Sequence, residues 1–270
     1  MKSVWIIQAE TNIHVGNENT SSVGLIDKEI QRNVLTTIPC INASSLKGAM
    51  NEYATSEARL SPAERVAIFG VDKKDKKDEI VETQKGGCLF FDAYLLLLPV
   101  QDDNNLYKLV TSKETLEQYV ELLKLMGIDL SYSGLVEELK KRDSHFDGEE
   151  GAGKSIIEHK AFTELCSNEE LPIVARNSLI GNGNLWYEQV LPQKSIFGTI
   201  LIAPSSIEVS RKEKDGEAQN PEKAKYKTVS VSVQNMDKII TKTFDKQIVQ
   251  IGANATIGYG YCQFIKIKEV

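Results

Sequence analysis

The sequence predicts a mixed α+β fold, and three observations point to it. Short apolar runs of strand length occur near both ends of the chain and in its middle, for example Val4 to Ala9 and Ser195 to Ala203. Single amphipathic helices separate some of these runs, but strands and helices do not alternate one for one. The chain has 270 residues, 41% hydrophobic and 26% charged, and contains no internal repeat. We therefore predict a single domain over residues 1–270.

The N-terminal part is predicted to contain two strands and two helices. The first strand, Val4 to Ala9, precedes a polar, glycine-dotted segment. Ser44 is a plausible N-cap for the first helix. Ser61-Pro62-Ala63-Glu64 is a capping box with proline at the first helical position, and Gly70 is expected to end that helix. Gly87 to Leu98 is predicted to form one long buried strand.

Residues 101–150 are predicted to form an acidic helical insertion. They contain 12 acidic and 6 basic residues, which gives this segment a net charge of −6. Ser112 is expected to cap an amphipathic helix that ends at Gly127, and a second short helix is predicted over about 135–141. Residues 143–155 are expected to be a loose loop. Because the whole chain also carries −6, the other 220 residues are electrically balanced.

The C-terminal part is predicted to be mostly strand. The expected strands are Leu171 to Arg176, Leu185 to Leu191, Ser195 to Ala203, Ile248 to Ile251 and Tyr261 to Ile267. Asn177 to Asn184 is predicted to be the turn between the first two. One helix is expected over Gln234 to Phe244, and the polar stretch Arg211 to Lys227 is expected to be a mobile loop.

Composition excludes several classes of protein. The longest apolar run, Ala93 to Val100, has the length of a strand and is interrupted by Pro99, so no membrane segment is expected. The N-terminus lacks a signal-peptide pattern, and the four cysteines form no Cys-x-x-Cys pair. We therefore expect a cytoplasmic protein with reduced, mostly buried thiols and no zinc site.

Gly148 to Ser155 matches the Walker A pattern of nucleotide-binding loops, but its context argues against such a site. A phosphate loop follows a buried strand and opens a helix, whereas the residues before Gly148 are charged and helical in pattern. Glu149 and Glu150 would also repel a triphosphate. We predict an acidic loop that binds no nucleotide.

Two glycine-bearing segments at opposite ends of the chain suggest contact with a phosphodiester backbone. Ser44-Ser45-Leu46-Lys47-Gly48 offers hydroxyls, helix N–H groups and one cation near a helix start. Residues 252–260 carry three glycines, which let backbone N–H groups approach an anion closely. Alone, Lys47 would be an ordinary surface lysine.

Asp27 is the candidate catalytic residue, with Arg32 close behind it and His14 upstream. A carboxylate beside an RNA backbone can hold a hydrated divalent cation or help to activate a ribose 2′-OH. The competing interpretation is structural: Asp27 caps a turn or pairs with Arg32, and His14 is a buried structural histidine.

Trp186 and Tyr187, followed by Glu188, are candidates for stacking on bases. Alternation along a strand points the two rings to opposite faces, so we expect at least one of them in the core.

The order of several motifs resembles the backbone RAMP subunit of type III-B (Cmr-type) CRISPR effectors. These motifs are His14-Val15-Gly16, Asp27-Lys28-Glu29-Ile30-Gln31-Arg32, Ile38-Pro39, Ser45-Leu46-Lys47-Gly48, Asp92 to Val100, Leu185-Trp186-Tyr187-Glu188, Leu191-Pro192 and Thr256-Ile257-Gly258-Tyr259-Gly260. Each is short, but they are collinear over nearly the whole chain.

This resemblance implies a modified ferredoxin-like (RRM-type) RAMP core with a thumb hairpin over about 172–192. The segment Arg176 to Leu185 is short for this family and lacks its Asp-x-x-Thr-Gly element. Copies of the subunit would stack along a CRISPR guide RNA, beside other type III-B subunits, and each thumb would wedge into the duplex of guide and target single-stranded RNA. The target RNA would be cut at regular intervals at Asp27 with a weakly held divalent cation, Mg²⁺ or Mn²⁺, and His14 would assist.

The motifs and the resemblance together predict a set of RNA-binding residues. They are Arg32, Ser44, Ser45, Lys47, Gly48, Arg176, Trp186, Tyr187, Glu188, Gly252, Thr256, Gly258 and Gly260. Two alternatives remain open: a non-catalytic RNA-binding scaffold, and a metal-independent RAMP nuclease that processes precursor guide RNA. The second would require a histidine acid–base pair, and the chain has only three histidines, far apart in sequence.

Overall fold

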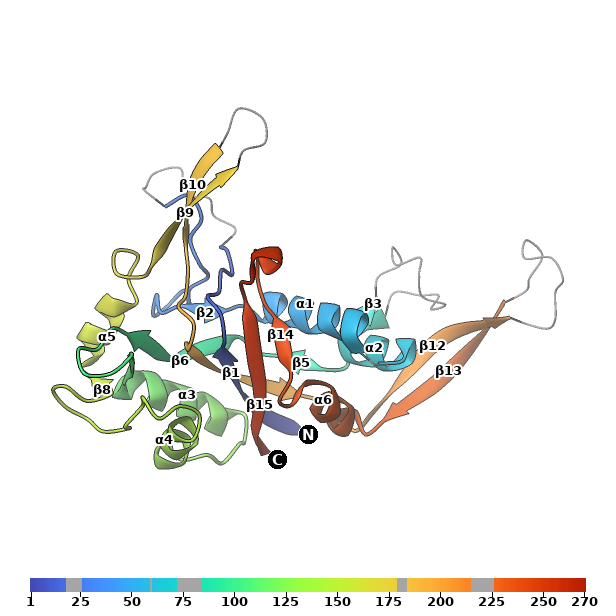
Figure 1. Cartoon of the computed structure of the whole chain (residues 1–270). Coiled ribbons are helices and arrows are strands. Elements are labelled where there is room, and N and C mark those ends of the chain that lie inside the picture. Colours follow the sequence, from blue (N-terminus) through green and yellow to red (C-terminus); the bar gives the residue numbers. More distant parts are fainter. Residues whose placement is uncertain (18–25, 59, 72–83, 179–183, 215–225) are drawn as a thin grey trace.

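The computed structural model describes residues 1–17, 26–58, 60–71, 84–178, 184–214 and 226–270 (Figure 1). In this part of the chain, a nine-stranded sheet forms the centre of the molecule. Its main path runs β14 (Ile248–Gln250), β15 (Tyr261–Glu269), β1 (Lys2–Ala9), β11 (Ile196–Ile202), β6 (Ala93–Val100), β7 (Lys108–Ser112) and β8 (Ile156–Ile157). The short strands β2 (Cys40–Ile41) and β5 (Leu89–Phe90) pair with β6 and β11.

Four antiparallel strands, β15, β1, β11 and β6, lie side by side in that order. The chain visits them in the order β1, β6, β11, β15. Helix α1 (Ala43–Tyr53) lies between the first two in sequence, and α6 (Met236–Phe244) lies between the last two. The α+β class predicted from the sequence is confirmed.

The sheet is covered by helices on both faces, because successive side chains of a strand point to opposite sides. In β1, Trp5 and Ile7 join one core cluster while Val4 and Ile6 join another. The first cluster contains apolar residues of α1, α2 (Pro62–Phe69), α5 (His159–Leu165) and α6. The second contains those of α3 (Lys113–Leu125) and α4 (Tyr132–Lys140).

Two hairpins extend from this body (Figure 1). One is β9 (Ile173–Ser178) with β10 (Asn184–Gln189), which lies within the predicted thumb range 172–192. The other is β12 (Ser206–Lys214) with β13 (Tyr226–Gln234). The expected mobile loop over Arg211 to Lys227 is therefore wrong at both ends, which are paired strand. Residues 215–225, and 179–183 of the predicted thumb turn, lie outside the described residues.

The N-caps predicted for two helices, α2 and α3, are confirmed. The side chain of Ser61 accepts a hydrogen bond from the Glu64 backbone and the reciprocal bond is present, so the capping box of α2 is confirmed. Gly70 ends that helix with φ of 81°. Ser112 caps α3 by accepting from the Thr115 N–H.

Two other expectations are wrong, and Asp92 explains both. The predicted strand over Gly87 to Leu98 is broken into β5 and β6, with Asp92 between them. Its Oδ1 accepts a hydrogen bond from the Ala43 N–H at 2.7 Å. Helix α1 therefore begins at Ala43 and is capped by a distant carboxylate, while Ser44 lies inside its first turn.

The Walker-like loop does not stand between a strand and a helix. It follows α4 and leads into β8, and Lys154 pairs with Glu149 of the same loop at 2.5 Å. The absence of nucleotide binding remains a prediction. Helix α5 follows shortly after this loop and was not anticipated.

Candidate nucleic-acid interface

Asp27 lies on an exposed segment that runs alongside β10. The N–H groups of Asp27 and Lys28 both donate to the Tyr187 carbonyl at 3.1 Å, and the Gln189 N–H donates to the Lys28 carbonyl at 2.9 Å. Oδ2 of Asp27 accepts from the Tyr187 N–H at 2.7 Å. Among the described residues, nothing donates to Oδ1. The carboxylate is thus held by one oxygen and offers the other outward, and it does not pair with Arg32.

Glu188 joins the Asp27 segment, the β9–β10 hairpin and the C-terminal glycine loop. Its side chain is about 2% exposed and accepts from Lys28 Nζ at 3.0 Å, Arg176 Nε at 3.2 Å, Trp186 Nε1 at 2.8 Å and Asn254 Nδ2 at 2.8 Å. Burial by itself would raise the pKa of Glu188, but the hydrogen bonds from these four donors lower the pKa to about 2. Glu188 is therefore a buried carboxylate anchor, and its oxygens are already occupied.

Two cation–ring contacts reinforce this junction. Lys28 Nζ lies 4.8 Å from the centre of the Trp186 ring, and the Arg176 guanidinium lies 4.5 Å from that of Tyr259. Neither Trp186 nor Tyr187 belongs to the core, so the expectation that one of them would be buried is wrong. The buried neighbours are instead Glu188 and Gln189, since the end of β10 inserts between the body and the Asp27 segment.

His14 is buried, with 3% of its surface exposed. Its Nδ1 lies 2.7 Å from the Gln189 carbonyl. A carbonyl only accepts hydrogen bonds, so Nδ1 carries a proton and donates to it. The other ring nitrogen, Nε2, faces Gly16. The His14 carbonyl accepts from the Ala253 N–H at 2.9 Å. The structure therefore gives His14 the structural setting that was weighed against a catalytic one.

Arg32 also points inward. Its Nη1 donates to the carbonyls of Thr37 at 2.8 Å and Cys166 at 2.6 Å, and Nη2 donates to Gln189 Oε1 at 3.4 Å. Burial lowers the pKa of Arg32, and nearby groups, Cys166 first among them, act in the opposite direction. With these contacts, Arg32 braces the Asp27 segment; its contact with RNA remains a prediction.

The start of α1 lies against the Asp27 segment through Gln31. The Gln31 amide donates to the Gly16 carbonyl at 3.3 Å and to Ser45 Oγ at 3.0 Å, and its Oε1 accepts from the Asn42 N–H at 2.8 Å. Ser44 and Gly48 are exposed on this helix. A Cβ at Gly48 would meet nothing within 4 Å, so that surface of α1 is open.

The glycines of the C-terminal loop have two different roles. Gly252 has φ of +86°, and a Cβ there would lie 3.0 Å from both the His14 carbonyl carbon and a Val15 methyl, so no other residue fits. Gly260 is buried against the Ile251 carbonyl. Gly258, with φ of +83°, has no atom within 4 Å of such a Cβ, and it is exposed with Thr256. Gly252 and Gly260 therefore fix the conformation of the loop, whereas Gly258 and Thr256 form its exposed surface.

One hollow of about 360 Å³ gathers part of the predicted set. Its lining includes Gly16, Ser45, Gly48 and Gly252, from three separate parts of the sequence. Asp27, Trp186 and Tyr187 do not line it. Sequence reasoning thus grouped the start of α1 with the glycine loop correctly. It missed the roles of Lys28, Asn254 and Gln189, because their hydrogen-bond partners are remote in sequence.

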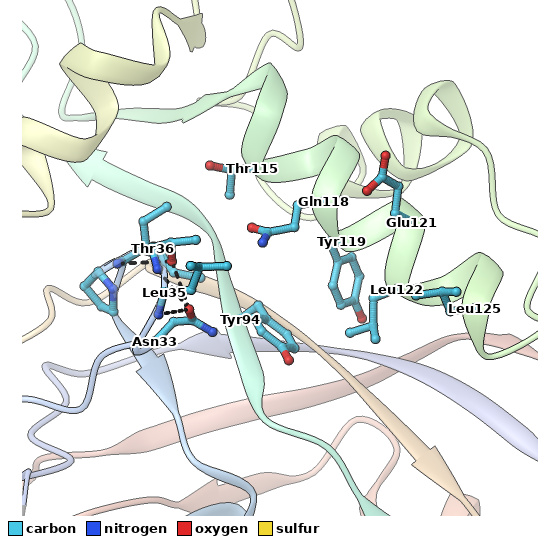
Figure 2. A pocket seen from close by; sticks show the side chains of 13 residues that line it. Asn33, Leu35, Thr36, Tyr94, Thr115, Gln118, Tyr119, Glu121, Leu122 and Leu125 are labelled. Carbon is cyan, nitrogen blue, oxygen red and sulfur yellow. Dashed lines mark hydrogen bonds between the residues drawn. The ribbon is translucent and has the colours of Figure 1, made fainter.

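Another hollow, of about 290 Å³, is separate from this interface. Figure 2 shows it between α3, β6 and the segment after Asn33, with Tyr94, Tyr119 and Leu122 among its lining residues. None of the predicted site residues lines it, although Asn33 follows Arg32 in the sequence. No basic residue lines it either.

Comparisons with known proteins were consistent with this geometry. The family model of the RAMP superfamily matches residues 6–263. The chain belongs to the RAMP superfamily. A curated relative, the CRISPR system Cmr endoribonuclease Cmr4 of Pyrococcus furiosus, is 25% identical over 93% of this chain and 90% of its own length. The predicted resemblance to the type III-B backbone subunit is thereby confirmed.

Solved structures share the RAMP fold of this chain. A type III-B Cmr-beta structure bound to cognate target RNA contains a chain with a TM-score of 0.67 and 19% identity, covering 98% of this chain and 97% of that one. Oligomeric Cmr4 from Pyrococcus furiosus gives a TM-score of 0.63 at 19% identity and covers 99% and 98%. At these identities the likeness concerns the fold. No helix in the described part of this RAMP protein is both long and apolar enough to cross a membrane.

Proposed function

We propose that this RAMP protein is the guide-RNA-binding backbone subunit of a type III-B effector, which cleaves guide-paired target RNA at Asp27. The observation that carries the proposal is the position of Asp27, exposed at the base of the thumb, with one oxygen fixed by the Tyr187 N–H and no donor to the other among the described residues. The Pyrococcus relative named as an endoribonuclease supports the activity over nearly the whole length of the chain.

The protein's contribution to cleavage is mainly geometric. Hydrogen bonds to the Tyr187 backbone fix Asp27 relative to the thumb, and Glu188 fixes the thumb relative to the C-terminal loop through Arg176 and Asn254. A target strand bent over this junction would have its 2′-OH brought into line with the adjacent phosphorus, a positioning effect. The free Oδ1 of Asp27 would then accept the hydroxyl proton or hold it in orientation.

A divalent cation, Mg²⁺ or Mn²⁺, fits this site only as a weakly held ion. Among the described residues, no three His, Cys, Asp or Glu side chains gather as a metal site, so the protein would supply the free Asp27 oxygen and RNA phosphates the remaining ligands. When bound, such an ion would neutralise charge that develops on the phosphate.

The finer description of the fold and setting belongs to the same proposal. The order β15-β1-β11-β6, with α1 and α6 as its two connecting helices, supports a modified ferredoxin-like core. We place the protein in the cytoplasm, stacked with further copies of itself and with other type III-B subunits along a guide RNA.

The first alternative, a scaffold without cleavage, differs from this proposal only at Asp27. The second, a metal-independent nuclease that processes precursor guide RNA, is not favoured. His14 is buried with Nδ1 bonded to a carbonyl, while His145 bonds Asp143 at 2.7 Å and His159, the first residue of α5, lies 2.8 Å from Ser112.

The decisive experiment compares Asp27→Asn with wild type in a reconstituted complex. Asn keeps an acceptor for the Tyr187 N–H but removes the charge, so guide binding should persist while target cleavage falls by a hundredfold or more, about 3 kcal/mol of lost transition-state stabilisation. Glu29→Gln, two residues away, is the matched control and should cleave normally. Cleavage by Asp27→Asn at the wild-type rate would contradict the role of Asp27 as the catalytic residue. Cleavage by wild type that EDTA does not affect would contradict the role of the divalent cation.

A further inference from the structure

Two hollows border α1. The first is the one lined by Gly48 and Gly252, and the second lies on a different face of the helix. Its volume is about 650 Å³, and it is an open depression bordered by α1, α2, β3 (Gly70–Val71) and β4 (Gln84–Lys85). We infer that this hollow is a second RNA-backbone site, in which Arg65 and Lys85 join Lys47 in binding the phosphodiester chain of the guide. The inference rests on the proposed function and extends the RNA path beyond the residues that sequence motifs marked.

The charge of the hollow is the first observation. Three described residues that line it are basic, Lys47, Arg65 and Lys85, and none is acidic. This is unusual for a chain whose net charge is −6. Like charges gathered in a concave surface raise the local concentration of anions, and a phosphodiester chain is the anion that binds several cations in a row.

The three basic side chains of the hollow are held in different ways. Arg65 Nη1 donates to Asn51 Oδ1 at 3.4 Å, which ties the guanidinium to α1. Lys47 Nζ lies 6.0 Å from the centre of the Phe90 ring. Among the described residues, neither Lys47 nor Lys85 forms a hydrogen bond or an ion pair through its side chain. Their ammonium groups are therefore available to a ligand.

Two glycines let β3 and the end of β4 pack backbone against backbone beside the hollow. A Cβ at Gly70 would lie 2.6 Å from the Gly86 nitrogen, and a Cβ at Gly86 would lie 2.6 Å from the Phe69 carbonyl carbon, so neither position admits a side chain. The adjacent Gln84 is anchored on β12, where its amide donates to the Glu208 carbonyl at 2.7 Å and accepts from the Ser210 N–H at 3.2 Å. This anchoring fixes the backbone that presents Lys85.

The hollow continues the interface described above. Ser45, Gly48 and Glu52 line the first hollow and recur on one face of α1, while Lys47 and Asn51 line the second from the adjoining face. An extended strand that crosses α1 at the open surface of Gly48 would pass from one hollow to the other. An acidic peptide would meet the same cations but would have no reason to follow the glycine-lined hollow, so RNA is the ligand that both surfaces favour.

The test is the salt dependence of RNA binding by the full chain. The double variant Arg65→Gln/Lys85→Gln is compared with wild type and with Lys124→Gln/Lys160→Gln, which removes the same charge from α3 and α5. The probe is a labelled single-stranded RNA of guide length. Removing two phosphate contacts should weaken binding by roughly tenfold at low salt and reduce the slope of log affinity against log salt by about 1.4, since each contact on a single strand contributes about 0.7.

Each outcome decides the matter. Unchanged affinity and slope in the double variant, with wild type binding RNA and Asp27→Asn inactive, would overturn this inference and leave the proposed function standing. Failure of the wild-type protein to bind RNA would overturn both. Loss of binding to an acidic peptide, with RNA binding unchanged, would also overturn it. If the double variant does not fold, Lys85→Gln alone, an exposed position, should reduce the slope by about 0.7, and no reduction would refute the site.

Discussion

At the scale of single residues, the buried carboxylate of Glu188 connects three parts of the interface. It receives donors from the Asp27 segment (Lys28), the β9–β10 hairpin (Arg176, Trp186) and the glycine loop (Asn254). Removing one member of such a buried charged group leaves its partners desolvated and uncompensated, which costs about 3–5 kcal/mol. The position of Asp27 therefore depends on a side chain that does not itself need to touch RNA.

The substitution Glu188→Gln should reduce the free energy of unfolding at pH 7 by about 3 kcal/mol. Because the folded pKa of about 2 lies below the ordinary value of 4.5, the ionised carboxylate stabilises the fold fully above pH 4.5. That stabilisation is lost as the pH falls towards 2. The variant should therefore show a flatter loss of stability between pH 5 and pH 2 in urea unfolding.

The matched control is Glu137→Gln, an exposed carboxylate on α4 that pairs with Lys140 at 3.3 Å. It should shift stability by less than about 0.5 kcal/mol. If the free energies of unfolding of wild type and Glu188→Gln fell in parallel between pH 5 and pH 2, Glu188 would not stabilise the fold as an ionised carboxylate held by its four donors.

At the scale of elements, the signals that the sequence carries are local, and so were the correct predictions. The capping box at Ser61 and the cap at Ser112 involve residues three positions apart, and both are formed as expected. The cap of α1 comes from Asp92, 49 positions after the N–H that it accepts from, and no local pattern records that pairing. Where a cap depends on the sheet, sequence position alone assigns it to the nearest hydroxyl, here Ser44.

The hairpin β12–β13 was missed for a different reason. Its outer part is charged, a composition that favours loops, yet the alternation of valine and serine from Val229 to Val233 is a strand pattern. Val209 and Val233 are buried against the body, and this buried inner end holds a hairpin whose outer part is polar. The charged composition therefore predicted a loop where the alternation of valine and serine indicates a strand.

The two candidate caps of α1 can be tested against each other. Asp92→Ala removes the acceptor of the Ala43 N–H and should reduce the free energy of unfolding by about 1 kcal/mol. Ser44→Ala should change it by less than about 0.5 kcal/mol, because Ser44 is exposed in the first turn and alanine favours helix. Urea unfolding at pH 7 measures both, and a larger loss in Ser44→Ala than in Asp92→Ala would reverse the assignment.

At the scale of the whole molecule, the sheet separates two surfaces of different charge. The acidic segment 101–150 contributes α3 and α4, which pack on the sheet through Leu116, Tyr119, Leu123 and Leu135. The start of α1, the C-terminal loop and the His14 segment pack on the other core cluster. The segment that carries the net charge of the chain thus covers one face, and the predicted RNA residues gather with the elements of the other.

This separation predicts where RNA lies in the assembled complex. Phosphates are repelled by the acidic layer and attracted to the glycine loop and the start of α1, so ultraviolet crosslinks to guide and target RNA should map to residues 14–48, 176–188 and 252–260. With the second hollow included, peptides containing Arg65 and Lys85 should also be labelled. The internal control is the segment 112–141, which contains α3 and α4 and packs on the other face of the sheet. Strong guide crosslinks there, and their absence from the glycine loop, would place the RNA on the opposite face of the sheet. They would also separate Asp27 from its substrate.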